Sequence, residues 1–386
     1  MRVVLEGRSL GLGGSRGGID TYWRALVSGL LEQTRREEDP TFILLTAFLH
    51  PRRAKGLDAF RRQGAVLRHW WATPGFLERA GSLGLRTEWL AGPYDLFHAL
   101  EPVWGIPGSG RLVVTAHDLM FRRHPQYLHP DWVRRLEEGV GQAVERASLW
   151  ICVSRHTGED VIRTLGVPRG RTQVIYHGVD DRFRQAAEGN GTRERAARLP
   201  GLGERPYFLF LGSLEPKKNL PFLLRAFGAA LEGGLRADLV VAGRAGWRAE
   251  AVREAARELP GLRTRVRFLG FVPDADLPLL MAGARALVLP SRFEGFGMPV
   301  LEAMAAGVPV LHSDRGALPE VAGGAGRSFD PDDVEGLAEL LGRIDEDDTL
   351  WEDLRRAGLE RSRPFTWERC ARETLAAYQR ALGLPR

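Results

Sequence analysis

The stretch 285–313 limits the fold of this chain more than any other, because it joins two buried strands through a glycine-rich turn and a helix. The runs 286–289 (ALVL) and 308–311 (VPVL) are apolar, which is typical of strands inside a parallel sheet. Between them, Pro299 opens a short helical pattern that Gly307 closes. A strand, a helix and a second strand in this order predict a parallel sheet covered by helices.

The turn ahead of that helix has the elements of an anion-binding site. The N–H groups of Gly295, Gly297 and Met298 precede the helix without intrahelical partners, and such a helix start attracts phosphate. Glu294 lies before the turn and Glu302 in the expected first helical turn. Two acids would repel a bare phosphate, so we expect a ligand that also offers hydroxyl groups, as a nucleotide sugar does. Taken singly, either acid is equally well explained as a solvated or helix-dipole carboxylate.

Residues 294–302 resemble the signature of the retaining glycosyltransferases of family 4, in which two glutamates eight residues apart bracket a glycine-rich turn. The resemblance implies an α/β chain of the GT-B fold, with two Rossmann-like doubly wound domains that face each other across a cleft. It implies that Glu294 contacts the transferred sugar and Glu302 the ribose. The turn residues that would bind the diphosphate are Gly295, Phe296, Gly297 and Met298.

The length of 386 residues exceeds the size at which a single core stops growing, so two domains are expected. We place a Rossmann-like acceptor domain at 1–185 and a Rossmann-like nucleotide-sugar domain at 206–365. The residues between them lack a clear apolar period, which indicates a connection. The resemblance implies that the C-terminal helix, 366–386, packs back on the first domain.

The composition excludes several classes of protein. Lysine and arginine outnumber the acids by only 54 to 49, which argues against a nucleic-acid binder but permits anionic ligands or an anionic membrane surface. Cys152 and Cys370 are the only cysteines, so we expect neither a disulfide framework nor a thiolate metal site. We find no signal peptide and no run long enough to cross a bilayer. We therefore expect a cytoplasmic protein, with peripheral contact at the inner face of the membrane left open.

The N-terminal glycine-rich loop, between a strand at 1–5 and a helix at 19–33, is the usual opening of a doubly wound sheet. The loop does not match the dinucleotide fingerprint, because Arg16 stands where the third glycine after Gly11 and Gly13 is required. This weakens the alternative of an NAD-dependent dehydrogenase. It leaves a flexible loop or a different phosphate ligand as explanations.

Two features of the N-terminal half are site candidates. His117 directly follows the buried strand 111–116, at the sheet edge where open α/β proteins bind ligands, although a histidine that only caps the strand remains an alternative. Family members resembling this chain carry His-Asp-Leu here, which implies that His117 touches the donor sugar. The resemblance also implies that Gly17 and Gly18, at the start of the first helix, approach the donor phosphate or the acceptor.

Basic and aromatic residues alternate after the strand 41–48. The run 51–55 (PRRAK) precedes Trp70, Trp71 and Phe76. Such a mixture marks an interfacial membrane contact or an acceptor surface, but a solvated helix face with snorkelling side chains is the more common explanation.

The second domain opens with the buried strand 207–211, and the loop after it carries Ser213, Lys217 and Lys218. A lysine at the carboxyl end of a strand and close to a helix start is placed to neutralise a diphosphate, so we select Lys218, with Lys217 as a helper. The loop resembles the family's Glu-Pro-Arg-Lys-Asn variant. Many relatives carry an arginine where this chain has Ser213, so the contacts to the leaving group depend more on Lys218 here.

Two further loops of the second domain bear on ligands. In relatives, the nucleotide base rests against the residues equivalent to Phe271 and Val272. The acid pairs at 274–276 and 330–332 imitate a metal site, but both precede helical patterns, so helix capping explains them better and we expect no metal and no cofactor.

The resemblance implies metal-independent, retaining transfer of a hexose from a nucleotide-diphosphate sugar to a hydroxyl of a glycan or lipid-linked acceptor, in surface polysaccharide biosynthesis. His117, Glu294 and Lys218 would be the catalytic residues. The His-Asp-Leu and Glu-Pro-Lys-Lys-Asn combination favours GDP-mannose over a UDP-sugar. A non-catalytic nucleotide-sugar-binding protein on the same fold is the alternative, and an NAD-dependent dehydrogenase is less favoured.

Overall fold

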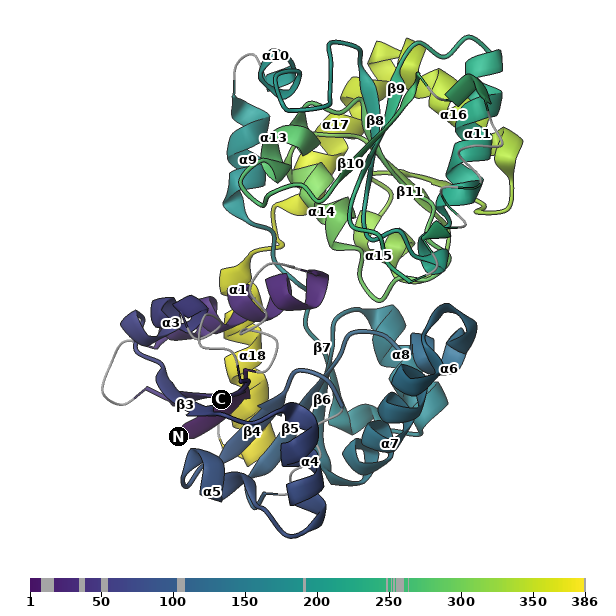
Figure 1. The fold of residues 1–386 in the computed structure, drawn as a ribbon. Coiled ribbons are helices and arrows are strands. Elements are labelled where there is room, and N and C mark those ends of the chain that lie inside the picture. The colour runs from purple at the N-terminus through teal and green to yellow at the C-terminus, as the bar shows by residue number, and fades with distance from the viewer. Residues whose placement is uncertain are drawn as a thin grey trace. The chain divides into compact units, whose positions relative to one another are not determined.

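The chain divides into two compact units in a computed structural model (Figure 1). Unit 1 comprises Met1–Pro125, Pro130–Gly178 and Phe365–Arg386, and unit 2 comprises Gln126–His129 and Val179–Pro364. The main change of unit therefore falls at Gly178, whereas the sequence analysis placed the connection near 185–206. The structure describes residues 1–7, 17–34, 39–49, 55–102, 108–189, 192–247, 249–250, 252, 254, 260–262 and 264–384.

Unit 1 is built on a parallel sheet of seven strands among its described residues, ordered β3-β2-β1-β4-β5-β6-β7. Its strands are β1 (Arg2–Glu6), β2 (Thr41–Ala47), β3 (Val66–Trp70), β4 (Leu96–Ala99), β5 (Arg111–Ala116), β6 (Ala147–Cys152) and β7 (Thr172–Val174). The strand order reverses between β1 and β4, which pair directly, with Val3 opposite Leu96. Ligands bind at such a reversal in open α/β sheets.

Helices flank this sheet, and α1 and α18 lie side by side on one face of it (Figure 1). The helices are α1 (Gly18–Gln33), α3 (Asp58–Arg62), α4 (Pro74–Ser82), α5 (Thr87–Ala91), α6 (Met120–Arg123), α7 (Pro130–Arg146), α8 (Arg155–Leu165) and α18 (Trp367–Leu382). The core beneath α1 and α18 includes the fully buried Trp23, Leu26 and Tyr378. Thr366 caps α18 by accepting a hydrogen bond from the Arg369 N–H at 3.1 Å, which fixes the start of the helix.

Unit 2 contains a second parallel sheet, of six strands among the described residues, ordered β10-β9-β8-β11-β12-β13. Its strands are β8 (Tyr207–Leu211), β9 (Asp238–Ala242), β10 (Val266–Gly270), β11 (Ala286–Leu289), β12 (Val310–Ser313) and β13 (Arg327–Phe329). The order reverses between β8 and β11, where Leu209 lies opposite Leu287. The strands predicted at 207–211 and 286–289 are confirmed to the residue.

Helices cover both faces of this sheet as well (Figure 1). They are α9 (Asp181–Glu188), α10 (Thr192–Ala196), α11 (Leu220–Glu232), α13 (Leu277–Ala282), α14 (Met298–Ala305), α15 (Leu318–Ala322), α16 (Val334–Glu346) and α17 (Asp348–Ser362). The short 3₁₀ turns among the described residues are η2 (Lys55–Leu57), η3 (Pro125–Tyr127), η4 (Arg169–Arg171), η5 (Pro216–Lys218) and η6 (Pro260–Leu262).

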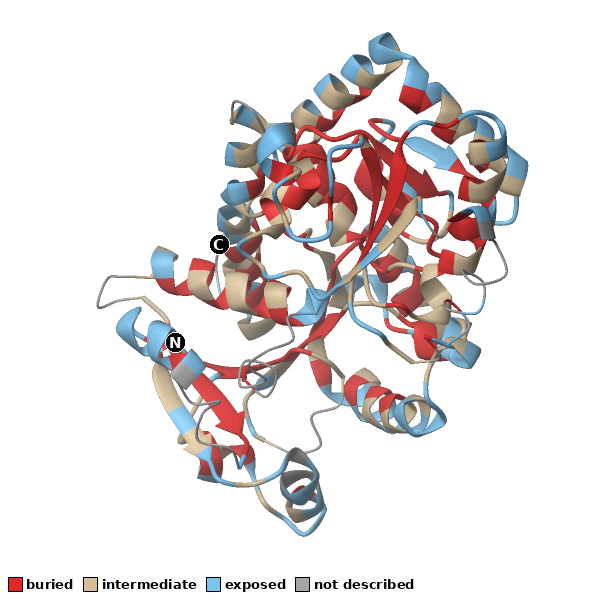
Figure 2. Cartoon of the chain, turned by 45° about the horizontal axis from the view of Figure 1, so that its top comes forward, coloured by how far each residue is buried: buried red, intermediate tan, exposed pale blue. Residues whose placement is uncertain are grey.

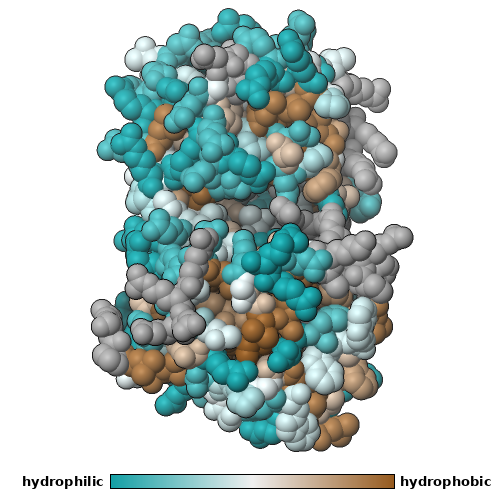
Figure 3. All heavy atoms as spheres, turned by 90° about the vertical axis from the view of Figure 1, so that its left-hand side faces the viewer, coloured by the Kyte–Doolittle hydropathy of each residue, from teal (hydrophilic) through white to brown (hydrophobic). Residues whose placement is uncertain are grey.

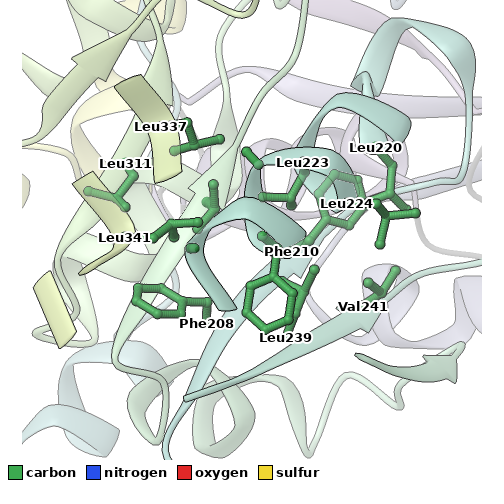
Figure 4. Packing of buried hydrophobic residues seen from close by; sticks show 14 of the residues in the cluster. Phe208, Phe210, Leu220, Leu223, Leu224, Leu239, Val241, Leu311, Leu337 and Leu341 are labelled. Carbon is green, nitrogen blue, oxygen red and sulfur yellow. The ribbon is translucent and has the colours of Figure 1, made fainter. Parts of the chain in front are cut away.

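The core of unit 2 forms between α11, α16 and the central strands. Leu223 and Leu224 of α11 lie against Phe208 and Phe210 of β8, and Leu337 of α16 closes the cluster (Figure 4). Burial of each such side chain contributes about 1.5–3 kcal/mol. In both units the central strands are buried while the outer faces of the helices are exposed (Figure 2). These cores hold the carboxyl ends of the strands, and the loops that follow them, in fixed positions.

The region 55–91 is more ordered than its mixed sequence indicated. It forms α3, the edge strand β3, α4 and α5 in succession. The run 51–54 lies outside the described residues. Within the described chain, no helix combines the length and apolar character needed to cross a bilayer.

Candidate active site

Two candidate residues lie at the strand reversal of unit 2. Lys218 ends the short turn η5 that follows β8, and Glu294 lies in the loop that follows β11. Because β8 and β11 are neighbours and parallel, these two loops leave the same edge of the sheet side by side. The sequence analysis selected both residues separately, and the structure brings them together.

Lys218 and Glu294 form an ion pair, with the ammonium donating to Oε1 at 2.5 Å. Their side chains are only 11% and 12% exposed. Burial opposes ionisation of Glu294, but the ammonium of Lys218, then that of Lys217, and the hydrogen bond from Lys218 together lower the pKa of Glu294. The carboxylate is therefore ionised at neutral pH and is held by a cation at the sheet edge.

The loop after β12 fixes the backbone of Glu294. Ala317 N–H donates to the Glu294 carbonyl at 3.0 Å. Gly316 has φ +63°, and a Cβ there would lie 2.6 Å from the same carbonyl oxygen, so a larger residue would push the loops apart. The position of the Glu294 carboxylate therefore depends on two loops at the carboxyl edge of the sheet.

The start of α14 provides backbone N–H groups next in the chain. Gly297 adopts a left-handed conformation (φ 94°) just before Met298, and a Cβ on it would lie 2.5 Å from Leu318 Cδ2. Pro299 occupies the second helical position, where its missing N–H costs nothing. Gly295 and Phe296 are buried in the turn. The first turn of α14 carries no acid, so the positive end of the helix is not neutralised locally.

Glu302 is the fifth residue of α14 and not, as expected, part of its first turn. The explanation as a helix-dipole carboxylate therefore fails. Burial, followed by the nearby carboxylates of Asp180 and Asp274, raises the pKa of Glu302 to about 7, with Arg182 opposing the shift. The free protein thus holds Glu302 half-protonated near neutral pH.

The groups around Glu302 come from α9 and from the loop before α13. Arg182 donates to Asp180 Oδ2 at 2.8 Å and to the Asp274 carbonyl at 3.2 Å. Sequence reasoning did not connect these residues with Glu302, because they lie far away in the chain. Asp274 was interpreted as a helix cap, and Asp180 in fact caps α9, where it accepts a hydrogen bond from the Arg182 N–H.

The predicted base-binding residues lie at the same carboxyl edge of the unit 2 sheet, after its outermost strand β10. Phe271 follows β10 and is 47% exposed, with the half-buried Val272 after it. The guanidinium of Arg244, which follows β9, lies 4.1 Å from the centre of the Phe271 ring. The sequence analysis did not select Arg244, although it follows a buried strand at the same edge.

Ser213 and Lys217, the remaining candidates in the loop after β8, are held in place by backbone hydrogen bonds. The Ser213 carbonyl accepts from Glu215 N–H at 2.9 Å, and the Lys217 carbonyl accepts from Arg292 N–H at 2.8 Å. Both side chains are half-buried. Lys217 also lowers the pKa of Glu294, so its charge acts at the same place as that of Lys218.

The acid pairs interpreted as helix caps have other roles. Asp276 precedes α13 but its side chain makes no capping hydrogen bond, and Asp333 caps α16 in place of its neighbours. Asp330 and Asp332 instead pair with arginines, at 3.1 Å and 2.6 Å. In the described part of the chain, no three or more His, Cys, Asp or Glu side chains gather in a way that could hold a metal ion.

In unit 1, Gly17 is the residue before α1 and Gly18 is its first residue. Gly17 has an ordinary extended backbone, and a Cβ there would meet no atom of the described residues within 4 Å. The free protein therefore gives no steric reason for a glycine at this position. The earlier part of the loop, with Gly11, Gly13 and Arg16, lies outside the described residues.

His117 follows β5, and its ring makes a hydrogen bond to the backbone of Leu100, which follows β4. Its Nε2 atom is buried and has no hydrogen-bond partner among the described residues. Burial lowers the pKa of His117 to about 4, so the imidazole is neutral at pH 7. The Tyr22 ring of α1 lies edge-on to it, with 5.1 Å between ring centres.

A buried chain of hydrogen bonds, which the sequence did not indicate, lies beneath His117. Tyr22 Oη is 3.5 Å from Thr115 Oγ1, which lies 2.8 Å from His98 Nε2. His98 Nδ1 is 2.6 Å from the hydroxyl of Tyr378 on α18. The chain links α1, β5, β4 and the C-terminal helix, and so supports the strand end from which His117 projects.

Comparison with known proteins decides the family. Residues 16–183 match the description "Glycosyltransferase Family 4", and residues 205–347 match "Glycosyl transferases group 1". Over 273 residues the chain is 35% identical to the O-antigen chain mannosyltransferase B of Escherichia coli, covering 70% of each protein. The chain is a family 4 glycosyltransferase. This match disfavours the dehydrogenase alternative.

Further relatives of this family 4 glycosyltransferase differ in length. The serotype-specific mannosyltransferase WbdA of Escherichia coli is 28% identical over 75% of the chain, which spans only 36% of that protein. The solved structure of Anabaena HepE in complex with UDP and glucose superposes with a TM-score of 0.75 at 20% identity, covering 98% of this chain and all of that one. This likeness confirms the predicted GT-B fold of two Rossmann-like domains.

Proposed function

We propose that this family 4 glycosyltransferase transfers a hexose, with retention of configuration, from a nucleotide-diphosphate sugar to a hydroxyl of a glycan or lipid-linked acceptor in surface polysaccharide synthesis. The observation that carries the proposal is the buried Lys218–Glu294 pair at the strand reversal of unit 2. Mannose with GDP as carrier is the favoured donor, because the relatives include the O-antigen chain mannosyltransferase B and the serotype-specific mannosyltransferase WbdA. The HepE complex with UDP makes UDP the alternative carrier.

Lys218 is proposed to stabilise the leaving diphosphate. In the free enzyme its charge is balanced by Glu294 at 2.5 Å. A diphosphate would offer several charged oxygens to the same ammonium, to Lys217 and to the N–H groups at the start of α14. The residues of that helix start are Gly295, Phe296, Gly297 and Met298, with Ser213 placed on the loop of Lys218. Negative charge that develops on the leaving group would be stabilised by ammonium and N–H groups that are already in position before the reaction.

Glu294 is proposed to bind the transferred sugar. When Lys218 turns to the diphosphate, the ionised carboxylate becomes available to accept hydrogen bonds from sugar hydroxyl groups. A carboxylate near the anomeric carbon also stabilises the positive charge that develops there. Lys218 would therefore bind the diphosphate of the donor, and Glu294 would bind its sugar.

Glu302 is proposed to hold the ribose, since its carboxylate can accept hydrogen bonds from two neighbouring hydroxyl groups. Phe271 and Val272 are proposed to support the nucleotide base. The guanidinium of Arg244 on the Phe271 ring favours guanine, which presents the O6 and N7 acceptors that arginine contacts well.

In unit 1, His117 is proposed to accept a hydrogen bond from a sugar hydroxyl at its Nε2 atom. The atom is buried, neutral and without a partner among the described residues, which suits an acceptor role. Gly17 and Gly18 are proposed to approach the donor or acceptor without a side chain in the way.

The proposed reaction takes place on one face of the sugar. The bond from the anomeric carbon to the diphosphate oxygen breaks, and the acceptor oxygen forms a bond to that carbon from the same side. The acceptor's proton passes to the departing phosphate oxygen, so no side chain has to act as general base. Lys218 and Lys217 supply the positive charge, and the proposal includes no metal and no cofactor.

The alternative is a protein that binds nucleotide sugars without transfer. A thermal-shift panel of GDP, UDP, their sugars and NAD tests binding, because a ligand that binds only the folded protein raises the unfolding temperature, and a tighter ligand raises it more at equal concentration. Transfer or slow hydrolysis of radiolabelled GDP-mannose tests catalysis. Stabilisation by GDP with turnover supports the proposal. Stabilisation without turnover of any donor supports the alternative, and stabilisation by NAD alone would overturn both.

The proposed setting is the cytoplasm, with peripheral contact between unit 1 and the inner face of the membrane. A lipid-linked acceptor would be available at that surface.

A further inference from the structure

The large apolar side chains that the described residues expose are concentrated in one part of unit 1. Eleven such side chains are exposed, and six of them fall between Leu49 and Trp89. These six are Leu49, Trp70, Trp71, Phe76, Leu83 and Trp89. Solvent-exposed tryptophans gathered in this way indicate a surface that another apolar phase covers.

Trp70 connects three of the elements that carry these side chains. Its carbonyl accepts from Phe48 N–H at 3.2 Å, and its indole N–H donates to the Leu90 carbonyl at 3.1 Å. The residues next to these contacts are Leu49, Trp71 and Trp89, which follow β2, follow β3 and lie on α5, and are 59% to 67% exposed. The Trp71 ring packs on His69 with 4.5 Å between ring centres, on the other face of β3 from Trp70, so these side chains lie around the edge strand of the sheet. The four side chains of Leu49, Trp70, Trp71 and Trp89 are called the tryptophan patch below.

Positive charge accompanies the patch. Residues 51–91 contain eight lysines and arginines against three acids, an excess of five, which equals the formal net charge of +5 of the whole chain. Arg68 shares one face of the edge strand β3 with Trp70 and is exposed. The other described arginines of this region, Arg61, Arg62, Arg79 and Arg86, are exposed as well.

Few acids offset these arginines. Asp58 is exposed on α3, while Glu88 is turned toward Arg86 at 3.6 Å and accepts a hydrogen bond from Ser109 N–H. The side of the molecule on which α3 and β3 lie in Figure 1 shows hydrophobic atoms gathered over unit 1 with hydrophilic ones beside them (Figure 3).

We propose that the tryptophan patch, with Phe76 of α4 and the surrounding arginines, docks unit 1 on an anionic phospholipid bilayer. Indole rings prefer the interface between lipid headgroups and hydrocarbon, and arginines are attracted to anionic headgroups. The combination of both on side chains that the described part of unit 1 leaves exposed favours a bilayer over a soluble protein partner. The inference rests on the proposed peripheral setting of the enzyme and names the surface responsible.

The test is co-sedimentation of the full chain, without nucleotide, with vesicles of phosphatidylcholine alone or mixed with phosphatidylglycerol. The wild type is expected to bind the mixed vesicles, more weakly as salt is raised, with a blue shift of tryptophan fluorescence. The double variant Trp71→Ala/Trp89→Ala should bind at least about tenfold more weakly, because it loses two aromatic anchors. Arg68→Glu should weaken binding about fivefold or more, since one cationic side chain contributes roughly that factor.

Matched controls separate docking from folding. Trp132→Ala removes a part-exposed indole on α7, and Arg195→Glu reverses an exposed arginine in unit 2. Both should bind vesicles as the wild type does, and all variants should keep its unfolding temperature. Donor hydrolysis without vesicles should be unchanged in every variant, so a failed donor assay and a failed vesicle assay are independent results.

Three results would overturn the proposal. One is no binding to the mixed vesicles, and a second is equal binding by the wild type and the patch variants. The third is a concentration-dependent dimer, seen by light scattering, that the patch variants abolish, because the patch would then join two copies of this chain.

Discussion

The unusual protonation of Glu302 leads to a prediction that can be worked out in numbers. Burial and the carboxylates of Asp180 and Asp274 raise its pKa from 4.5 to about 7, against the pull of Arg182. A raised carboxyl pKa favours folding of the protonated form, so this contribution to stability is complete below about pH 4.5 and is lost as the pH rises through 7. The full loss is about 3 kcal/mol in the free energy of unfolding, at 1.36 kcal/mol per pKa unit.

The affinity for a nucleoside diphosphate should change with pH in the opposite direction to the stability of the free protein. If ribose hydroxyls donate to Glu302, the ligand selects the ionised form, and its affinity should rise with pH. With a pKa of about 7, roughly one carboxyl in eleven is ionised at pH 6 and ten in eleven at pH 8, so the affinity should increase about tenfold over this range. Binding at pH 7 should release about half a proton.

The assay is calorimetric titration with GDP or UDP, whichever stabilises the protein, from pH 6 to pH 8 in buffers of different ionisation enthalpy. The ligand's own phosphate titrates near pH 6, so Glu302→Gln is the reference, because it retains that titration and removes the carboxyl. His117, with a pKa of about 4, stays neutral throughout. Identical pH dependence and proton release in wild type and variant would refute the proposed role of Glu302.

Three further predictions concern single side chains. Lys218→Ala should lower kcat/KM about thirty- to a thousandfold while the protein stays folded, because a charge-assisted contact in the transition state contributes about 2–4 kcal/mol; a tenfold loss or less would assign the leaving group to other residues. Glu294→Gln should impair transfer much more than nucleoside diphosphate binding, and calorimetry that shows equal losses would exclude a sugar-facing role. Tyr378→Phe should lower the free energy of unfolding in urea by about 1–3 kcal/mol, because His98 loses its partner at 2.6 Å; an unchanged midpoint would show that this hydrogen bond is not stabilising.

The sequence predicted best where a strand is buried on both faces. The strands at 111–116, 207–211 and 286–289 are confirmed residue by residue, because a continuous apolar run between turn residues has few other interpretations. The edge strand β3 was missed. Its residues alternate between half-buried and exposed and include Arg68 and Trp70, and such a pattern is also typical of a polar surface segment.

The candidate site was also predicted only in part. Lys218 was found because it follows a buried strand, and Glu294 because it flanks the glycine-rich turn of the family signature. Their pairing across 76 residues follows only from the neighbouring positions of β8 and β11. The surroundings of Glu302 were not predictable, since Arg182 and Asp274 meet across 92 residues and no local pattern joins them. The functional roles of these residues stay predictions.

A crystal structure of the enzyme with GDP or UDP tests the central claim most directly. The account predicts the diphosphate against the ammonium of Lys218 and the first N–H groups of α14, with the ribose at Glu302 and the Lys218–Glu294 ion pair opened. A diphosphate bound away from the loops that follow β8 and β11, with that ion pair intact, would contradict it.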